Sequence, residues 1–319
     1  MGMLVQGLWQ DVPYETRSGE FLRKDSEFRD RVTADGSSGF RAEAGRYHLY
    51  VSLACPWAHR TLIVRALKGL EHAISVSIVD PYMGPEGWRF SGRGGSTRDT
   101  VNGATFLRDI YLKALPACTG RVTVPMLWDK GAETIVNNES SDIIRMLNRE
   151  FDAFASRELP DLYPEALQPQ IEYWNGLIYR TVNNGVYRAG FATAQDKYES
   201  AVHELFATLA MLDSALGKQR YLCGGTSTEA DWRLFTTLVR FDAVYYSHFK
   251  CNLRRLVDYQ NLWPYTRELY QVVGVAATVD LGQMKEHYYR SHPRINPTGV
   301  VPAGPELEFT SPHGREYLG

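Results

Sequence analysis

Cysteine is scarce in this sequence, and its four cysteines have neither the spacing of a zinc site nor the density of a disulfide framework. They are Cys55, Cys118, Cys223 and Cys251. Because no other cluster of metal-ligating residue types stands out, we expect no metal in this protein.

Long apolar runs and an excess of either charge are also absent. No stretch approaches the ~18 apolar residues of a membrane-spanning helix, and the first residues lack the basic and apolar segments of a secretory signal. The net charge is −2, with no basic cluster for binding nucleic acid. We therefore expect a cytoplasmic protein without membrane or nucleic-acid partners, in which a free thiol persists.

The first half of the chain alternates short β-prone runs with helical periodicity. The pattern predicts, in order, a strand over 47–52, a helix over 57–69, strands over 73–79, 121–129 and 134–136, and a helix opening at 137–142. The strand over 73–79 is short and apolar, so we expect it to be buried on both faces. A strand, a helix and a strand in this order require a parallel crossover unit, which predicts an α/β fold.

Cys55 lies where the first of these strands meets its helix. Pro56 suits the first helical turn, and a stop signal follows at Gly69. Cys55 is therefore expected at the N-cap, where the helix dipole lowers a thiol pKa from ~8.5 and populates the thiolate. The alternative is an ordinary buried cysteine. Ala58 stands where a Cys-x-x-Cys motif would have its second cysteine, so a redox cycle needs an external thiol.

Two other segments are expected near this thiol. Pro125 lies within a predicted strand, where proline requires an edge, a bulge or a cis bond; in a thiol-redox fold the bond is typically cis and places the preceding residue beside the cysteine. The helix start at 137–142 combines free N–H groups with serine and glutamate side chains, which suits a carboxylate and an amine. Residues 80–118 predict a long loop with a short helix near 104–113.

The second half is helical almost throughout. Helical faces recur over 171–182 and 198–216, a capping signal stands at Thr228–Asp231, and further helices are expected over 262–272 and 279–289. We divide the chain into an extension (1–45), a first domain (46–152), a helical domain (160–290) and an irregular tail (291–319).

Seven motifs together resemble one family, the xi-class glutathione transferases, which are the glutathionyl-hydroquinone reductases. The motifs are Cys55-Pro-Trp-Ala-His-Arg60, Gly87-Trp88-Arg-Phe90, Val124-Pro-Met-Leu-Trp-Asp129, Asn137-Asn-Glu-Ser-Ser141, Asn183-Asn-Gly-Val-Tyr187, Glu229-Ala-Asp-Trp-Arg233 and Ile295-Asn-Pro-Thr-Gly299. The resemblance runs from the 20s to the C-terminus. It implies an α/β thioredoxin-like N-terminal domain that binds glutathione, followed by an all-α helical C-terminal domain that binds the hydroquinone.

The resemblance also implies a reaction. Cys55 would attack the glutathione sulfur of a glutathionyl-hydroquinone, release the hydroquinone and form a mixed disulfide, which a second glutathione would resolve to glutathione disulfide. A thiol without a neighbouring cysteine independently favours such monothiol exchange.

The implied glutathione site consists of backbone and polar groups around the thiol. Val124 would clamp the cysteinyl unit, Glu139 and Ser140 would hold the γ-glutamyl end, and Trp88 and Arg121 would surround the tripeptide. An arginine fork matches a carboxylate, although a solvated charge at a strand end explains Arg121 equally well.

The implied hydroquinone site consists of Tyr187, Tyr245 and Tyr288 in the helical domain. A phenol packs against a ring and hydrogen-bonds its hydroxyl. Tyr187 and Tyr288 are expected to assist the carbon leaving group, by orienting it or by supplying a proton. For His59, a packing or capping role is favoured over catalysis.

Two other functions remain open from the sequence. One is an omega-like thiol transferase or dehydroascorbate reductase that uses the same Cys55, and the other is a non-catalytic glutathione-binding module. The resemblance further implies a homodimer through the helical domain, for which we expect exposed aromatic residues near 245–249. The physiological quinone is not indicated by the sequence.

Overall fold

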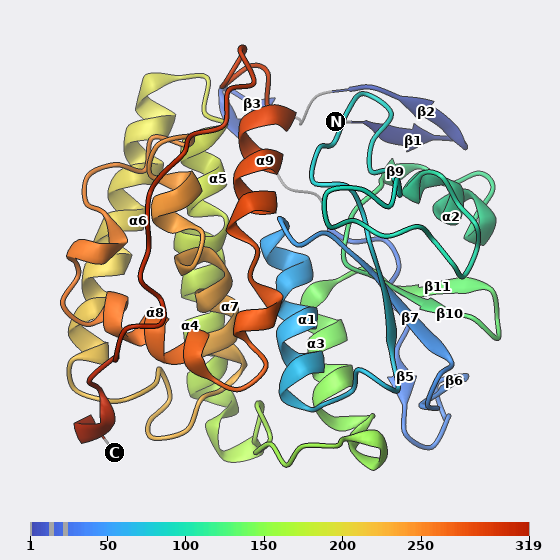
Figure 1. The fold of residues 1–319 in the computed structure, drawn as a ribbon, viewed down its shortest axis with the longest axis horizontal. Coiled ribbons are helices and arrows are strands. Elements are labelled where there is room, and N and C mark those ends of the chain that lie inside the picture. The colour runs from blue at the N-terminus through green and yellow to red at the C-terminus, as the bar shows by residue number, and fades with distance from the viewer. Residues whose placement is uncertain (1, 13–15, 22–24, 319) are drawn as a thin grey trace.

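The computed structural model describes residues 2–12, 16–21 and 25–318. A sheet-containing half and a helical half lie side by side, with helix α1 at their junction (Figure 1). This arrangement is the predicted α/β domain followed by an all-helical domain.

The main sheet of the first half has four strands in the order β11-β10-β7-β8. Its strands and the two helices beside it are β7 (Tyr47–Val51), α1 (Pro56–Leu67), β8 (Ser75–Ile78), β10 (Met126–Asp129), β11 (Thr134–Asn137) and α3 (Ser140–Arg149). β7 and β8 are parallel, and β10 runs antiparallel to both of its neighbours. The expected strand–helix–strand crossover is therefore confirmed.

Strand β8 differs from the expectation of burial on both faces. It is the edge strand of the sheet, with Ser75 exposed and Val76 and Ile78 only half-buried. A short apolar run is typical of a central parallel strand, but here the strand order leaves one side of β8 without a neighbouring strand. The prediction of burial on both faces was wrong, because the cover of each face depends on tertiary contacts that a short apolar run does not indicate.

The long segment after β8 contains the short helix expected near 104–113, which is α2 (Leu107–Ala114). It then enters β9 (Gly120–Arg121), which pairs with β1 (Met3–Val5), and β1 pairs with β2 (Leu8–Gln10). The first residues of the chain thus form a second sheet with a segment more than 100 residues away. Two further pairings of two-residue strands join β3 (Thr16–Arg17) to β4 (Glu20–Phe21), and β5 (Val32–Thr33) to β6 (Phe40–Arg41).

The helical half contains the helices that the periodicity predicts. They are α4 (Gln168–Ile178) with the π-helical turn η3 (Tyr179–Asn183), α6 (Gln195–Leu216), α7 (Glu229–Leu238), α8 (Leu262–Gln271) and α9 (Leu281–Ser291). Two further elements, α5 (Gly185–Gly190) and the π-helical turn η4 (Phe241–Tyr245), were not predicted. Thr228 and Asp231 form the expected capping box at the start of α7. Short 3-10 turns lie over Asp152–Phe154, Glu165–Leu167, Leu256–Asp258, Ala276–Thr278 and Glu316–Leu318.

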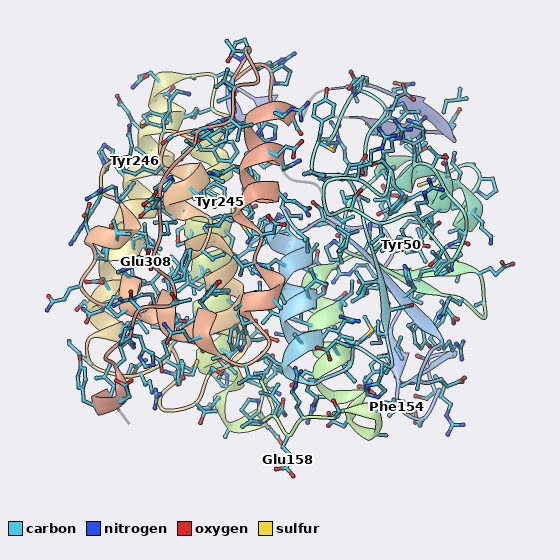
Figure 2. All side chains as sticks on the ribbon, in the orientation of Figure 1. Tyr50, Phe154, Glu158, Tyr245, Tyr246 and Glu308 are labelled. Atoms are coloured by element: carbon cyan, nitrogen blue, oxygen red, sulfur yellow. The ribbon has the colours of Figure 1, made fainter. Side chains whose placement is uncertain are left out.

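Most of the aromatic surface near 245–249 is buried, with only Tyr246 half-buried, which contradicts the expectation of an exposed patch. Tyr245 and Phe249 have no exposed surface. Tyr245 ends the π-helical turn η4, and its ring stacks on that of Phe249 inside the helical half with centroids 5.6 Å apart. Figure 2 shows Tyr245 among the helices, whereas Glu158 points outward from the segment between the two halves.

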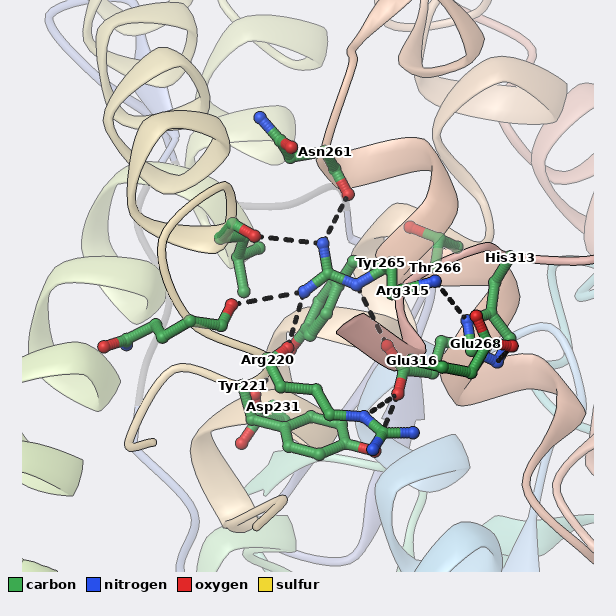
Figure 3. Close-up of polar contacts among 12 residues, drawn as sticks. Arg220, Tyr221, Asp231, Asn261, Tyr265, Thr266, Glu268, His313, Arg315 and Glu316 are labelled. Carbon is green, nitrogen blue, oxygen red and sulfur yellow. Dashed lines mark hydrogen bonds and ion pairs between the residues drawn. The ribbon is translucent and has the colours of Figure 1, made fainter. Parts of the chain in front are cut away.

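The C-terminal tail runs along the helical half and is fastened by Arg315 (Figures 1 and 3). Its side chain is 2% exposed, and its Nε donates to Glu268 over 2.9 Å. Its Nη1 and Nη2 donate to the carbonyls of Leu216 and Arg220. Glu268 also accepts from the Nε of Arg220 over 2.6 Å. The tail is therefore tied to the ends of α6 and α8.

We predict that Arg315→Ala lowers the free energy of unfolding by about 3 kcal/mol, because Glu268 would lose a buried ionic partner. Urea unfolding followed by tryptophan fluorescence measures the change. Arg255→Ala is the control, because its ion pair with Asp258 is exposed on both sides. A loss for Arg315→Ala no larger than that of the control would contradict the anchoring role.

Candidate active site

A cavity of about 370 Å³ opens where the two halves meet, and both halves line it. The sheet-containing half contributes Cys55, Trp88 and Val124, and the helical half contributes Tyr187 and Tyr288. Residues far apart in the sequence thus surround Cys55, the residue that was predicted to be reactive.

Cys55 is the N-cap of α1, as predicted, and Pro56 occupies the first helical turn. The thiol is half-buried and lines the cavity. Its Sγ donates to the Val124 carbonyl over 3.5 Å rather than capping a helical N–H among the described residues. A thiol that donates to a carbonyl is protonated, so loss of the proton would release Sγ from this contact.

The other cysteines lie in different surroundings. Cys118, Cys223 and Cys251 are buried, and burial raises the pKa of each thiol, to about 11 for Cys118 and Cys223. Since the thiolate is the nucleophilic form, burial disfavours reaction at these three positions.

The peptide bond between Val124 and Pro125 is cis, as the sequence analysis expected for a thiol-redox fold. The Val124 carbonyl accepts from the Cys55 thiol, and Val124 forms part of the cavity wall. Backbone polar groups of Val124 therefore lie beside the thiol at the cavity wall.

Glu139 and Ser140 lie at the start of α3, beneath the cavity wall rather than on it. The Glu139 carboxylate accepts from the Ser141 backbone N–H over 3.0 Å and from the Ser26 hydroxyl over 3.1 Å. Burial alone would raise the pKa of Glu139, but these hydrogen bonds outweigh it and hold the pKa below its usual value. Ser140 is buried and accepts from Arg60 over 3.3 Å.

Trp88 and Arg121 both line the cavity. The Trp88 ring stacks on His287 with centroids 4.9 Å apart. Arg121 is half-buried and its Nη1 donates to the Val12 carbonyl over 2.7 Å. A fully solvated charge at a strand end, the alternative from sequence, therefore does not describe Arg121.

The hydroxyls of the three predicted tyrosines meet in one hydrogen-bonded cluster. The Tyr288 oxygen lies 2.5 Å from that of Tyr187 and 3.1 Å from that of Tyr245. Tyr187 and Tyr288 line the cavity, and Tyr245 lies behind them. Burial raises the pKa of Tyr245 and Tyr288, so both phenols keep their protons at neutral pH.

His59 is buried and does not line the cavity among the described residues. Its Nδ1 lies 2.9 Å from Nη1 of Arg240, which can only donate, so Nδ1 is the acceptor. Its Nε2 then donates to the Thr278 hydroxyl over 2.8 Å. Burial and the nearby Arg240 charge lower the pKa of His59 well below its usual value. The imidazole is thus neutral and joins the two halves.

The N-terminal segment also contributes to the cavity, which its sequence did not indicate. Trp9, Asp25, Ser26 and Glu27 line the cavity, although residues 1–45 were interpreted as an extension over the surface. The Ser26 hydroxyl is close to both the Asn138 carbonyl and Glu139. The segment has no hydrophobic periodicity, so no local signal indicated this position.

His287 and His292 on and just after α9 were also missed. The Nδ1 of His287 donates to the Pro81 carbonyl over 2.8 Å, which leaves Nε2 as an acceptor. Burial lowers the pKa of His287 to about 4, so the ring is neutral at physiological pH. Its place next to Tyr288 in the sequence was the available signal.

The described part of the chain has neither a metal-binding cluster nor a membrane-spanning helix. No group of three or more His, Cys, Asp or Glu side chains there is arranged to hold a metal ion. None of the helices in the described ranges has the length and apolar character needed to cross a bilayer.

Two domain families match the chain. The N-terminal domain of glutathione S-transferase matches residues 54–150, and the C-terminal domain matches residues 195–268.

Similar proteins extend this match over nearly the whole chain. The Escherichia coli protein named glutathionyl-hydroquinone reductase YqjG is 54% identical over 99% of this chain and 99% of its own. Glutathionyl-hydroquinone reductase PcpF of Sphingobium chlorophenolicum is 53% identical over 96% of both. The structure of a xi-class transferase from Natrialba magadii has a TM-score of 0.94 at 52% identity, covering 100% of this chain and 97% of that one. The glutathione-bound structure of YqjG has a TM-score of 0.92 at 52% identity, with 98% and 99% covered. The chain therefore belongs to the glutathionyl-hydroquinone reductases, the xi class of the glutathione transferases.

Proposed function

We propose that this protein catalyses the glutathione-dependent reduction of glutathionyl-hydroquinones to hydroquinones. The observation that supports this most is the cavity itself, in which one half-buried thiol has the Val124 backbone on one side and a tyrosine cluster on the other. A peptide-like thiol and an aromatic ring joined to it match these two walls. The two relatives described above bear the name of this activity.

In the first step, the Cys55 thiolate attacks the sulfur of the glutathionyl-hydroquinone. A sulfur–sulfur bond forms and the bond between sulfur and the ring carbon breaks. The electron pair stays on the ring carbon, which takes up a proton and leaves as part of the hydroquinone. The ring carbon is reduced, and the two sulfur atoms are oxidised to a mixed disulfide between Cys55 and glutathione.

In the second step, the thiolate of a second glutathione attacks the mixed disulfide. Glutathione disulfide leaves, and Cys55 returns as a thiolate. The proton lost by the second glutathione balances the one taken up by the ring. Because the nearest position for a resolving cysteine is Ala58, the external thiol is the expected resolving agent.

For glutathione, we propose a position along Val124, with Trp88 and Arg121 around the tripeptide. Arg121 has a guanidinium fork at the cavity wall, which matches a carboxylate. Glu139 and Ser140 would hold the γ-glutamyl end, together with the neighbouring Ser26 and Asn138, which line the cavity. The short contacts of Glu139 to three hydroxyl or amide groups support a fixed carboxylate at this point.

For the hydroquinone, we propose contact with Tyr187 and Tyr288, supported by Tyr245 behind them. Because both Tyr245 and Tyr288 retain their protons, the cluster can donate a hydrogen bond to a hydroxyl or phenolate oxygen. It also provides an O–H group from which the ring carbon can be protonated.

We also propose that two copies pair through the helical half, as the family resemblance implies. Light scattering of the purified protein should then give twice the mass of one chain, whereas the mass of a single chain would rule out this assembly.

We predict that Cys55→Ala abolishes reductase turnover, because the nucleophile is removed, while glutathione binding stays measurable by calorimetry. Cys118→Ala is the matched control, since that thiol is buried in the core and should leave turnover nearly unchanged. Turnover of Cys55→Ala near that of the unmodified protein would contradict the mechanism.

Mass spectrometry should detect the proposed intermediate directly. Protein incubated with a glutathionyl-hydroquinone is expected to gain one glutathione on Cys55 and to lose it when free glutathione is added. Adducts on Cys118, Cys223 or Cys251 in place of Cys55 would show that the wrong thiol has been assigned.

The tyrosine cluster should separate the proposed reaction from dehydroascorbate or simple disulfide reduction. We predict that Tyr288→Phe lowers kcat for a glutathionyl-hydroquinone by about 100-fold, the range of a lost proton donor, with little change for a small glutathione mixed disulfide. Tyr259→Phe, a buried tyrosine outside the cavity, is the control. Equal losses on both substrates, or faster turnover of dehydroascorbate by the unmodified protein, would favour the omega-like alternative.

A further inference from the structure

Arg240 lies between α7 and η4 and is fully buried directly behind the Cys55 segment. Its Nε donates to the Ala54 carbonyl over 2.9 Å, and its Nη2 donates to the Leu53 carbonyl over 2.9 Å. These are the two residues that precede Cys55 in the chain. Arg240 of the helical half thus hydrogen-bonds to the turn that precedes Cys55.

The remaining contacts of Arg240 are also to neutral groups. Its Nη1 donates to the Thr236 carbonyl over 2.7 Å and to Nδ1 of His59 over 2.9 Å. Among the described residues, no carboxylate lies within ion-pair distance of this guanidinium. A buried cation without a counter-charge is costly, and proteins normally pair it.

Two other buried arginines illustrate the usual arrangement. Arg315 is equally buried and donates to backbone carbonyls, but it also forms an ion pair with Glu268. Arg60, behind the cavity wall, is attracted to the Glu139 carboxylate. Within the described ranges, Arg240 therefore differs from both in having no carboxylate opposite its positive charge.

The charge of Arg240 acts on titratable groups around the turn and on the helical side of the cavity. It opposes the rise that burial causes in the pKa of Tyr245 and Tyr288, and it contributes to the lowered pKa of His59 and His287. The groups affected belong to α1, η4 and α9, which surround the turn that Arg240 holds. A positive charge at this place stabilises an anion in the cavity and destabilises a second cation.

We propose that Arg240 is a positioning residue for Cys55, which fixes the Leu53–Ala54 turn and supplies the positive charge that stabilises the Cys55 thiolate. The counter-charge of this buried guanidinium is then the reaction's own anion. The inference depends on the proposed function in one respect, namely that Cys55 is the nucleophile.

Other titratable or charged groups also surround Cys55. Those described around the cavity or behind the turn are Asp25, Glu27, His59, Arg60, Tyr111, Arg121, Tyr187, Tyr245, His287, Tyr288 and His292. The three histidines have a lowered pKa and are neutral at physiological pH, and the two carboxylates would oppose a thiolate. Arg121 lines the wall proposed for glutathione, and Arg60 is offset by Glu139. Arg240 is thus the described cation that both holds the two residues before Cys55 and lacks a described carboxylate partner.

The test is the pH dependence of alkylation of Cys55 by iodoacetamide, located by peptide mass spectrometry and measured without any hydroquinone. Arg240→Gln and Arg240→Met remove the charge, and glutamine still donates to a carbonyl. Both should raise the midpoint of the alkylation profile by about one pH unit, the effect expected for loss of a nearby opposite charge. Arg240→Lys keeps the charge and should stay within about half a unit of the unmodified protein.

Arg315→Gln is the matched control, because it removes another buried arginine that holds backbone carbonyls at a distance from the cavity. Its alkylation midpoint should not move. An unchanged midpoint in a folded Arg240→Gln or Arg240→Met protein would overturn the proposal. If both neutral variants fail to fold while Arg240→Lys folds, the charge serves the fold and the proposal is also overturned. Because alkylation needs only the thiol, a failed reductase assay would leave this result interpretable.

Discussion

The burial of helix α1 between the two halves is the constraint on which the rest of the structure depends. α1 packs against α3 on one side and α7 on the other, and even its polar residues His59, Arg60 and Thr61 are buried. Buried polar groups require partners. Those of α1 come largely from the helical half, where Thr278 and Arg240 meet His59 and Asn183 accepts from Arg60 over 2.8 Å. Separating the halves would leave these groups unsatisfied, so the start of α1 is held rigidly at the junction.

This constraint explains why the chemistry is divided between the two halves. The sheet-containing half presents Cys55 and the cis Val124–Pro125 backbone, and the helical half presents the tyrosine hydroxyls. Neither half by itself places a thiol and a phenol in one cavity. A rigid junction also preserves their separation, and small misplacements of reacting groups are costly to rate.

Local signals in the sequence predicted the elements of the site. Features that depend on tertiary contacts could not be predicted from it. Cys55-Pro56 and the Thr228–Asp231 capping box are read within one helical turn, so both were found correctly. The edge position of β8 and the inward turn at Tyr245 depend on which neighbours the chain finds. The contribution of Ser26 depends on contacts with residues more than 100 positions away, for which a non-periodic segment gives no signal.

Burial also sets the electrostatic character of the helical side of the cavity, since it keeps the tyrosine and histidine side chains there neutral. The phenols of Tyr245 and Tyr288 keep their protons, and the imidazoles of His287 and His292 stay without a second one. Neutral groups of low polarity around a thiolate screen it weakly, so any fixed charge nearby acts strongly. The same burial that holds the two halves together therefore makes the site responsive to the single charge that moves from the Cys55 sulfur toward the substrate.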